Sequence, residues 1–354
     1  MKSRKNTPPS LDELPMDDDP GAADRKRDHI ELAFKSQVEG DVLDDRFYYE
    51  PLLAAHPQAG SLQPMSFLGK TMRVPIWVSS MTGGTEWAGH INRNLARACK
   101  DFGMGMGLGS CRSLLYSDEH LPDFDVRDLI GEGQPFFANL GIAQLEQLVA
   151  RAELHRVPIL VDKLRADGLI IHVNPLQEWL QPEGDRFRVA PLETISRVLE
   201  EVSFPVIVKE VGQGMGRESL SALFKLPLAA IDFAAHGGTN FSMLEMLRDD
   251  PARRAIYEQL AFVGHGAHEM VDMSNLLMEE LKGQMACRQI IISGGVKNFL
   301  DGYYLIHRAH LPAVYGQASA FLRHATGDYK ALHTYVEAQV RGLELAQAYL
   351  KCKG

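Results

Sequence analysis

The chain has 354 residues, of which 45% are hydrophobic and 23% are charged, as in an ordinary globular protein. There are 37 Lys and Arg against 46 Asp and Glu, which gives a formal net charge of −9. This balance argues against nucleic acid as a partner, because binding to phosphate backbones requires a basic surface. A chain of this length fits one large α/β barrel or two smaller domains.

The cysteines and the hydropathy pattern point to a reduced, cytoplasmic protein with no membrane partner. The four cysteines are scattered and none lies at metal-ligand spacing from another: Cys99, Cys111, Cys287 and Cys352. The N-terminal stretch has no apolar core of the kind found in a secretory signal. No run approaches the ~18 consecutive apolar residues that a membrane span needs.

In chain order, residues 1–22 are rich in Pro, Asp and Ser, and we expect a mobile tail there. Residues 23–70 form the predicted N-terminal arm and lead-in, and residues 71–354 the predicted barrel. The arm starts with a helix in "DRKRDHIELAFKSQ" (24–37), where Ile30, Ala33, Phe34 and Gln37 share one face. The lead-in over 41–70 has several Pro and Gly and is expected to be irregular.

Beyond residue 70, short apolar runs alternate with segments of helical pattern. Nearly continuous apolar runs are typical of parallel strands that are covered on both faces. About eight such units predict a (β/α)8 TIM barrel with an N-terminal extension helix, and a doubly wound open sheet is the alternative. The runs are 74–80, 105–110, 136–141, 168–174, 205–211, 229–235, 289–295 and 312–318.

Each run ends in polar residues or glycine. Catalytic and binding residues of barrel enzymes lie at the carboxyl ends of the strands, so these ends predict one shared pocket. "SGGVKN" (293–298) and "YGQAS" (315–319) follow the last two strands, where barrels often bind phosphate through backbone N–H groups. The phosphate would belong to a nucleotide-type cofactor or to the substrate.

Lys209 interrupts an otherwise apolar strand, and a buried Lys needs a polar or anionic partner. The structural explanation is an ion pair with Glu210 or another carboxylate. However, neighbouring strand residues point to opposite faces, so Lys209 and Glu210 would not share the lumen, and a ligand-facing Lys is favoured.

In "LIIHVN", His172 and Asn174 have the spacing that puts both on one strand face, near the barrel mouth. Pro175 should end the strand, and Gln177 and Glu178 follow it on the loop or first helical turn. A basic group in "RKRDH" (25–29) and Arg112 are candidates for gripping an anion, although a charged run is usually a solvated helix face.

Taken together, these motifs resemble the type 2 isopentenyl-diphosphate isomerases over about residues 25 to 325. "IHVNPLQEWLQPEGDRF" (171–187) is the most specific match. The others are "RKRDHI", "SSMTGGT", "GLGSCR", "ANLG", "PVIVKEVGQGM", "GGTNFS" and "SGGV". The resemblance implies an FMN-dependent (β/α)8 barrel that needs Mg2+ and a reduced flavin, with NADPH as the reductant. It also implies a homo-oligomer that interconverts isopentenyl and dimethylallyl diphosphate.

The resemblance further implies roles for individual residues. Flavin contacts would come from Ser80, Met81, Thr82, Ser110, Asn139, Lys209 and Thr239, and the flavin phosphate would be held at Gly294, Gly295, Gln317 and Ala318. The substrate would be bound by Arg25, Lys26, His29, Ser110, Arg112, His172, Asn174 and Gln177. Gln177 and His172 would be the catalytic residues, with Gln177 beside the allylic group, and Glu178 would ligate Mg2+.

The sequence departs from the family pattern at a few positions and leaves two rivals. Cys111 stands where Gln is usual, and Gln213 takes an aromatic position. An FMN-dependent 2-hydroxy-acid oxidase or dehydrogenase is the main rival because His236 precedes Gly-Gly, but Thr239 stands where that class needs Arg. A flavin- or phosphate-binding barrel without enzymatic activity is the second rival.

Overall fold

Eight parallel strands close into a barrel in the order β10-β11-β4-β5-β6-β7-β8-β9. The computed structural model describes residues 22–80 and 83–353, and each barrel strand falls within one of the eight predicted runs. The strands are β4 (Ile76–Val78), β5 (Gly105–Gly107), β6 (Phe136–Gly141), β7 (Gly168–His172), β8 (Val206–Lys209), β9 (Ala230–Asp232), β10 (Ile290–Ser293) and β11 (Ala313–Gln317). The closed order confirms the predicted TIM barrel and excludes the open sheet.

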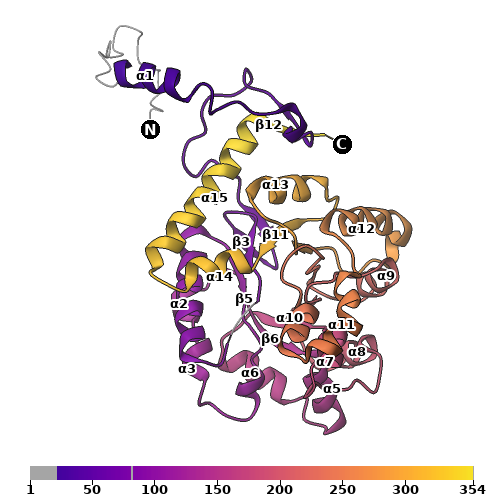
Figure 1. Cartoon of the computed structure of the whole chain (residues 1–354). Helices are drawn as coiled ribbons and strands as arrows, with labels where there is room; N and C mark the ends of the chain where they lie inside the picture. The colour runs from indigo at the N-terminus through magenta and orange to yellow at the C-terminus, as the bar shows by residue number, and fades with distance from the viewer. Residues whose placement is uncertain (1–21, 81–82, 354) are drawn as a thin grey trace. The chain divides into compact units, whose positions relative to one another are not determined.

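Helices surround the barrel, as Figure 1 shows for α2 and α15 on one side and α9 and α12 on the other. The longer ones are α2 (Glu86–Phe102), α5 (Ile142–Ala150), α6 (Arg156–Lys163), α8 (Pro191–Glu201), α9 (Arg217–Phe224), α10 (Phe241–Arg248), α12 (Ala267–Leu281), α13 (Phe299–Arg308) and α15 (Tyr329–Tyr349). The shorter ones are α3 (Leu121–Phe124), α4 (Arg127–Ile130), α7 (Pro175–Leu180), α11 (Pro251–Tyr257) and α14 (Ser319–Ala325). Four 3-10 turns are η2 (Gly40–Val42), η3 (Arg112–Leu115), η4 (Glu258–Phe262) and η5 (Lys282–Gln284).

Local sequence explains where the first barrel helix starts and stops. The Thr85 hydroxyl accepts a hydrogen bond from the Ala88 amide and caps the amino end of α2. Gly103, with φ +73°, ends the helix in the left-handed conformation that glycine adopts without steric cost. Between these caps, Ile91 and Leu95 are buried one turn apart, so the helix lays its apolar stripe on the strands.

The inner face of the barrel changes from apolar to polar along the strands. The lower layer is a fully apolar cluster that contains Trp77, Phe137, Ile170, Ile207, Ala230, Ile291 and Val314. Two residues further along, the same faces carry Asn139, His172, Lys209, Asp232 and Ser293. Because side chains alternate between faces, a step of two residues keeps the direction and raises the position toward the carboxyl edge. The polar layer therefore stands on an apolar one.

A hairpin closes the bottom of the apolar layer, in a segment expected to be irregular. Its strands are β2 (Met65–Phe67) and β3 (Lys70–Met72), which pair antiparallel. Phe67, Leu68 and Met72 belong to the lumen cluster, and the Leu68 amide donates to Gln289 Oε1 at 2.9 Å. A strand β1 (Phe47–Tyr49) also pairs with the C-terminal strand β12 (Leu350–Cys352). Each of these strands has only three residues, which is too short to show a period-2 pattern, and the sequence analysis therefore missed them.

The chain divides into two compact units between Asp45 and Arg46. The expected domain bounds, with the arm and lead-in ending at residue 70, stay a prediction. The first unit contains α1 (Ala22–Leu32), which is shorter than predicted. Lys35 and Ser36 both donate to the Leu32 carbonyl, so the chain turns there. Phe34, predicted on the helix face, is 83% exposed. Without apolar partners for that face, nothing extends the helix beyond Leu32.

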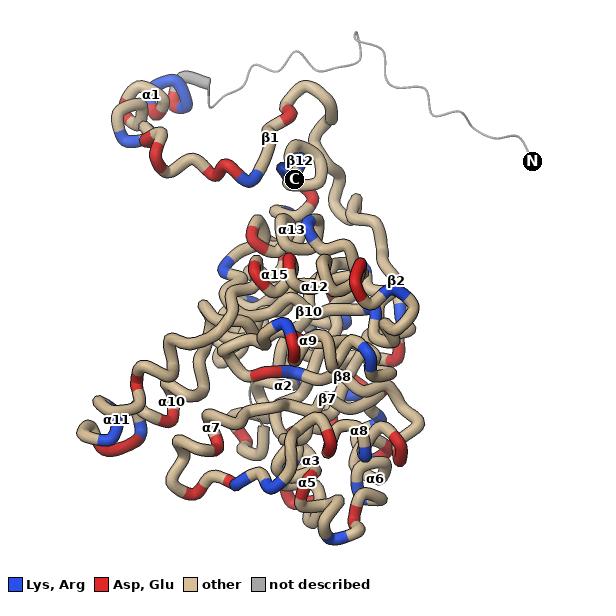
Figure 2. Tube along the Cα trace, turned by 90° about the vertical axis from the view of Figure 1, so that its right-hand side faces the viewer, with Lys and Arg blue, Asp and Glu red and all other residues tan. Residues whose placement is uncertain are grey.

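Charged residues of both signs are interspersed along the described residues of the barrel unit. Figure 2 shows both colours around α11 (Pro251–Tyr257), where Arg253 and Arg254 lie between Asp250 and Glu258 in the chain. In the part of the chain that the structure describes, no helix has both the length and the apolar character needed to cross a membrane. All four cysteines are free thiols, as predicted.

Phe67 should be among the strongest contributors to stability, because its fully buried ring fills the bottom of the barrel. We expect Phe67→Ala to lower the free energy of unfolding by about 3–5 kcal/mol. Phe262→Ala removes a ring that is 63% exposed and should cost much less. Urea unfolding of both variants followed by circular dichroism measures the difference; equal losses would contradict the role of the hairpin as the barrel floor.

Candidate functional site

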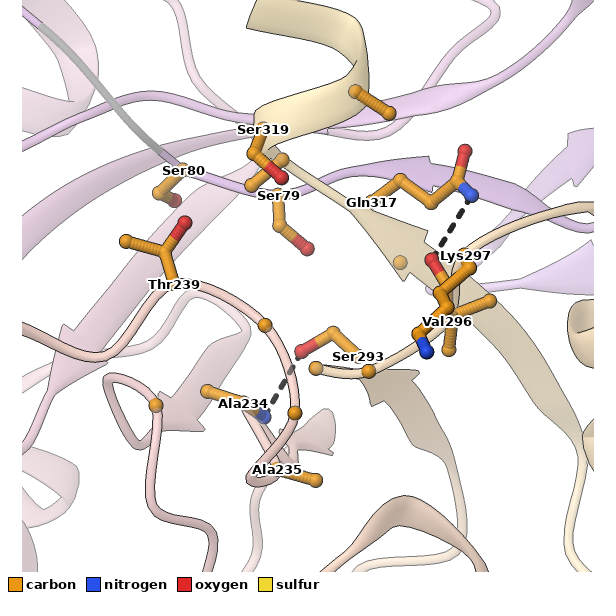
Figure 3. Close-up of a pocket in the computed structure, with 18 of the residues that line it drawn as sticks. Ser79, Ser80, Ala234, Ala235, Thr239, Ser293, Val296, Lys297, Gln317 and Ser319 are labelled. Carbon is orange, nitrogen blue, oxygen red and sulfur yellow. Dashed lines mark hydrogen bonds between the residues drawn. The ribbon is translucent and has the colours of Figure 1, made fainter. Parts of the chain in front are cut away.

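A cavity of about 350 Å3 opens at the carboxyl edge of the barrel, between the first strand and the last four. Figure 3 shows hydroxyl groups of Ser79, Ser80, Ser293 and Thr239 around the open space. Its lining also includes Lys209, Gly212, Gly237, Gly238, Gly294, Gly295, Lys297, Gln317, Ala318, Ser319, Arg323 and His324. The predicted flavin-contacting residues Ser80, Lys209, Thr239, Gly294, Gly295, Gln317 and Ala318 are therefore brought together. Met81 and Thr82 lie outside the described residues.

Glycines make one wall of this cavity out of backbone. Gly294 has φ +86°, and a Cβ there would lie 2.0 Å from the Ala235 carbonyl oxygen. Gly238 lies so close to the same loop that its Cβ would be 3.3 Å from the Gly295 nitrogen. Loops after β9 and β10 thus pack backbone against backbone, which leaves amide groups free to face an anionic ligand.

Three basic side chains besides Lys209 line the same cavity: Lys297 after β10, and Arg323 and His324 in the last turn of α14. No role was assigned to them from the sequence. Arg323 and His324 follow "YGQAS" closely, so the spacing from that motif was the signal that could have found them. The charges of Lys297 and Arg323 suit a phosphate at this end of the cavity.

Gln317 stabilises the cavity wall through its side chain. Its Nε2 donates to the Val296 carbonyl at 3.1 Å, and its Oε1 accepts from the Tyr335 hydroxyl at 3.1 Å. The first bond is drawn in Figure 3. Since both ends of the amide are engaged within the protein, Gln317 holds the loop after β10 in place, and its backbone is what faces a ligand.

Two hydroxyl groups in the cavity wall have no partner. The Oγ atoms of Ser79 and Ser80 are buried, and neither has a hydrogen-bond partner among the described residues. A buried hydroxyl left unpaired costs free energy, so these atoms indicate a polar ligand edge at this position. Ser80 was predicted as a flavin contact, and Ser79, which lies in the same "SSMTGGT" motif at the end of the first run, was given no flavin role.

Lys209 faces the cavity, as the sequence predicted, and its neighbour points elsewhere. The Lys209 ammonium donates to the Glu210 backbone carbonyl at 2.7 Å. The Glu210 carboxylate instead accepts from the amides of Gly212 and Gln213, both at 2.6 Å. The ion pairs of the described residues do not include one between these two side chains, so an ion pair with Glu210 does not explain Lys209. The other carboxylate near it is Asp232 on the neighbouring strand β9. Burial lowers the pKa of Lys209, and the nearby carboxylates of Asp232 and Glu210 act to raise it.

His172 pairs with Asn139 across strands β7 and β6. Its Nδ1 lies 2.7 Å from Asn139 Oδ1, and Asn139 Nδ2 donates to the Leu108 carbonyl at 2.9 Å. Because the amide orientation is set by the Leu108 carbonyl, Oδ1 is the acceptor and His172 Nδ1 carries the proton. Burial, together with the charge of Lys209, lowers the pKa of His172 to about 3. The imidazole is neutral near pH 7 and presents an unprotonated Nε2.

Asn174, Gln177 and Glu178 form a network at the start of α7. Asn174 Nδ2 donates to Gln177 Oε1 and to Glu178 Oε1, both at 3.1 Å. Strand β7 ends at His172, so Asn174 caps α7 and does not continue the lumen face that the period-2 pattern predicted. Pro175 at the first helical position explains the change of direction.

The two ends of this network are held by Glu245 and Asp185, to which the sequence analysis assigned no role. Gln177 Nε2 donates to Glu245 Oε1 at 3.0 Å, and the Asp185 amide donates to Glu178 Oε2 at 2.8 Å. Asn174 and Gln177 line a second cavity of about 590 Å3, which shares Val211 with the first. Asp185 belongs to the "PEGDRF" motif, and this motif is the sequence feature that could have identified it as a site residue.

The remaining predicted site residues lie on η3, on the loop after β5 and on α1. Arg112 starts η3, lies 3.6 Å from the Asp185 carboxylate and lines a third cavity with Gln144 and Gln147. Ser110 is exposed at the end of the loop after β5. Arg25, Lys26 and His29 lie on α1 in the unit that ends at Asp45, and their role in substrate binding stays a prediction. Among the residues described, no three His, Cys, Asp or Glu side chains are grouped as a metal site.

The eight-stranded parallel barrel is a (β/α)8 fold, and its carboxyl edge carries glycine loops and basic side chains. The chain is 35% identical to the isopentenyl-diphosphate delta-isomerase of Rickettsia felis over 327 residues, which covers 91% of each chain. It is 38% identical to that of a Synechococcus species over 283 residues, 78% of each. The chain belongs to the isopentenyl-diphosphate delta-isomerase family, which confirms the resemblance seen in the motifs. No family model matches it.

Similar solved structures agree on the fold. A flavocytochrome b2 variant with benzoylformate superposes with a TM-score of 0.59 at 14% identity, over 85% of this chain and 71% of that one. A mandelate oxidase mutant with an FMN adduct gives a TM-score of 0.52 at 12% identity, over 87% and 88%. At such low identity the likeness shows the barrel fold alone.

The low pKa of His172 predicts how stability should change with pH. The unfolded chain takes up a proton on this residue below about pH 6.5, whereas the folded chain takes it up only near pH 3. His172 therefore supports the fold above about pH 6.5, and this support is lost as the pH falls. Between about pH 7 and pH 5, wild type should lose roughly 1–2 kcal/mol more than His172→Gln in urea unfolding. Parallel losses in the two proteins would contradict a neutral, buried His172.

Proposed function

We propose that the chain interconverts isopentenyl diphosphate and dimethylallyl diphosphate, using FMN and Mg2+. Family membership at 35% identity over 91% of the chain supports the reaction. The observation that supports the cofactor is the composition of the first cavity, where unpaired Ser79 and Ser80 hydroxyls, a buried Lys209 and glycine loops meet.

The donor set of this cavity fits FMN from end to end. Backbone amides near Gly294 and Gly295, with the charges of Lys297 and Arg323, suit a phosphate. At the other end, Lys209, Ser80 and Thr239 offer polar groups to a ring system. The apolar layer below Lys209 excludes water and strengthens the effect of its charge.

The chemistry needs a cofactor because a double bond moves with no net redox change. An unactivated alkene must gain a proton at one carbon and lose one at another, and ordinary side chains are too weakly acidic for this. A reduced flavin, when bound, supplies a proton donor and acceptor of sufficient strength, so the protein provides binding and orientation. Lys209 would hold positive charge against the flavin edge that becomes more negative on reduction.

The network on α7 would position the substrate. The Gln177 amide is fixed at both ends, by Asn174 and by Glu245, so it can hold a defined orientation beside the carbon skeleton. His172 Nε2 is unprotonated, so contact with a diphosphate oxygen requires it to take up a proton, and the charge of a bound diphosphate favours that uptake. His172 would therefore bind as a cation only when substrate is present.

Glu178 fits a magnesium ion that is shared with the diphosphate. Each of its oxygens accepts one hydrogen bond, from Asn174 and from the Asp185 amide, which fixes the carboxylate and leaves further lone pairs. Mg2+ is commonly held by one or two carboxylates together with substrate phosphates and water. A single carboxylate at this position is therefore sufficient.

The direct test is an anaerobic assay with isopentenyl diphosphate, FMN, NADPH and Mg2+, followed by proton NMR of the prenyl methyl groups. We expect dimethylallyl diphosphate to form only when flavin is reduced and Mg2+ is present. No product from protein that holds reduced FMN would overturn the proposal. Bleaching of the bound flavin by lactate would instead favour a 2-hydroxy-acid oxidase.

Glu178→Gln removes the charge that would bind the metal and keeps the size of the side chain. We expect the Mg2+ concentration for half-maximal activity to rise by roughly tenfold or more, with FMN affinity nearly unchanged. Glu183→Gln, which changes an exposed carboxylate in the same loop region, is the matched control. If Glu178→Gln loses flavin while its response to Mg2+ is that of wild type, the metal assignment is wrong.

A further inference from the structure

Asp232 is a fully buried carboxylate directly beside Lys209. It ends β9, and the strand register pairs it with Lys209 on β8, which is itself paired with His172 on β7. Its exposed fraction is 0%. Neither the sequence motifs nor the proposed function gives it a task, yet a buried charge needs compensation.

The hydrogen bonds of Asp232 account for only half of the carboxylate. Its Oδ1 accepts from the Ser293 hydroxyl, and the Ser293 oxygen in turn accepts from the Ala234 amide at 2.9 Å. Its Oδ2 is buried and has no hydrogen-bond partner within the described residues. A role limited to anchoring β10 would use Oδ1 alone and would leave the second oxygen unexplained.

The same reasoning applies to the ammonium group of Lys209. Its one hydrogen bond within the described residues goes to a backbone carbonyl, that of Glu210, and an ammonium group has three protons to donate. Lys209 and Ser293 both line the cavity. Asp232 is fully buried, is hydrogen-bonded to Ser293 and is paired in register with Lys209. Oδ2 of Asp232 and the remaining protons of Lys209 are thus unpaired groups of opposite charge on adjacent strands.

The other titratable groups around the pair do not replace Asp232 as a source of negative charge. His172, on β7, is neutral because burial and the Lys209 charge lower its pKa to about 3. The Glu210 carboxylate points away and is bonded to the amides of the following loop. Burial raises the pKa of Asp232, and the Lys209 charge opposes that rise.

We propose that Asp232 is a positioning residue that acts through Lys209: the two side chains form a buried, net-neutral pair that keeps one proton beside the flavin. This inference rests on the proposed FMN site. With Asp232 present, the pair retains its proton whether the flavin is oxidised or reduced. Without it, the ammonium keeps only the smaller influence of the Glu210 carboxylate in the oxidised state, so Lys209 loses its proton there and regains one when two electrons enter the flavin.

The test is a redox titration of the holoprotein with dithionite at several pH values between about pH 7 and pH 9, where flavin absorbance reports the midpoint potential. Each proton taken up per two electrons changes the reduction equilibrium tenfold per pH unit. We expect wild type to take up one proton and Asp232→Asn to take up two, which doubles the slope of potential against pH. Equal slopes would overturn the proposal.

Two control variants separate charge from hydrogen bonding. Lys209→Arg installs a cation that does not lose its proton, so adding Asp232→Asn in that background should leave the slope unchanged. Ser293→Ala removes the bond to Oδ1 but keeps the Asp232 charge, and it should keep the wild-type slope. A doubled slope in the Arg background would show that Asp232 does not act through Lys209 and would also overturn the proposal.

A second measurement needs no flavin and covers the case in which Asp232→Asn folds poorly. Removing one member of a buried pair leaves an uncompensated charge, whereas removing both does not. In urea unfolding of the flavin-free chain, Lys209→Met with Asp232→Asn should therefore unfold at a higher urea concentration than Lys209→Met alone. Additive losses would contradict the pair. If FMN does not bind but this coupling is found, the proposed function fails and the pair stands.

Discussion

A buried ammonium group at the carboxyl edge of the barrel is the constraint on which the site depends. Lys209 stands one layer above a lumen filled by Phe137, Ile170 and Ile207, so water cannot solvate it from below. Its charge persists only if neighbouring strands supply compensation. Asp232 lies on one side, and a neutral His172 on the other. The positive charge of Lys209 therefore favours a ligand in the cavity above whose facing edge gains negative charge.

The barrel could be predicted because parallel strands covered on both faces are nearly continuous apolar runs. Lys209 stood out because a charged residue broke such a run, and Gly294 and Gly295 stood out by their position after the seventh strand. Asp232 was given no role, although it interrupts the predicted run 229–235 as Lys209 interrupts the run 205–211; the structure shows that β9 ends at this residue. Asn174 was misplaced because the strand stops two residues before it, and Phe34 because the helix ends at Leu32.

The proposed flavin site and the proposed substrate-positioning network lie in two adjoining cavities. The first, with Lys209 and the glycine loops, has the groups that suit a flavin, and the second contains Asn174 and Gln177. Val211 borders both, directly after the strand that carries Lys209. Glu245 fixes Gln177 from α10, a contact between side chains 68 positions apart that no local pattern could reveal. The site thus combines a rigid barrel edge with a side-chain network held by long-range contacts.

The central claim is that the cavity over Lys209 holds FMN, and titration of the purified full-length chain with FMN tests it most directly. Flavin fluorescence and absorbance would be followed while oxidised FMN is added, with riboflavin as the comparison that lacks the phosphate. The account predicts saturable binding of one FMN per chain and markedly weaker binding of riboflavin, since the glycine loops, Lys297 and Arg323 would contact the phosphate. No saturable FMN binding, or equal affinity for riboflavin, would contradict it.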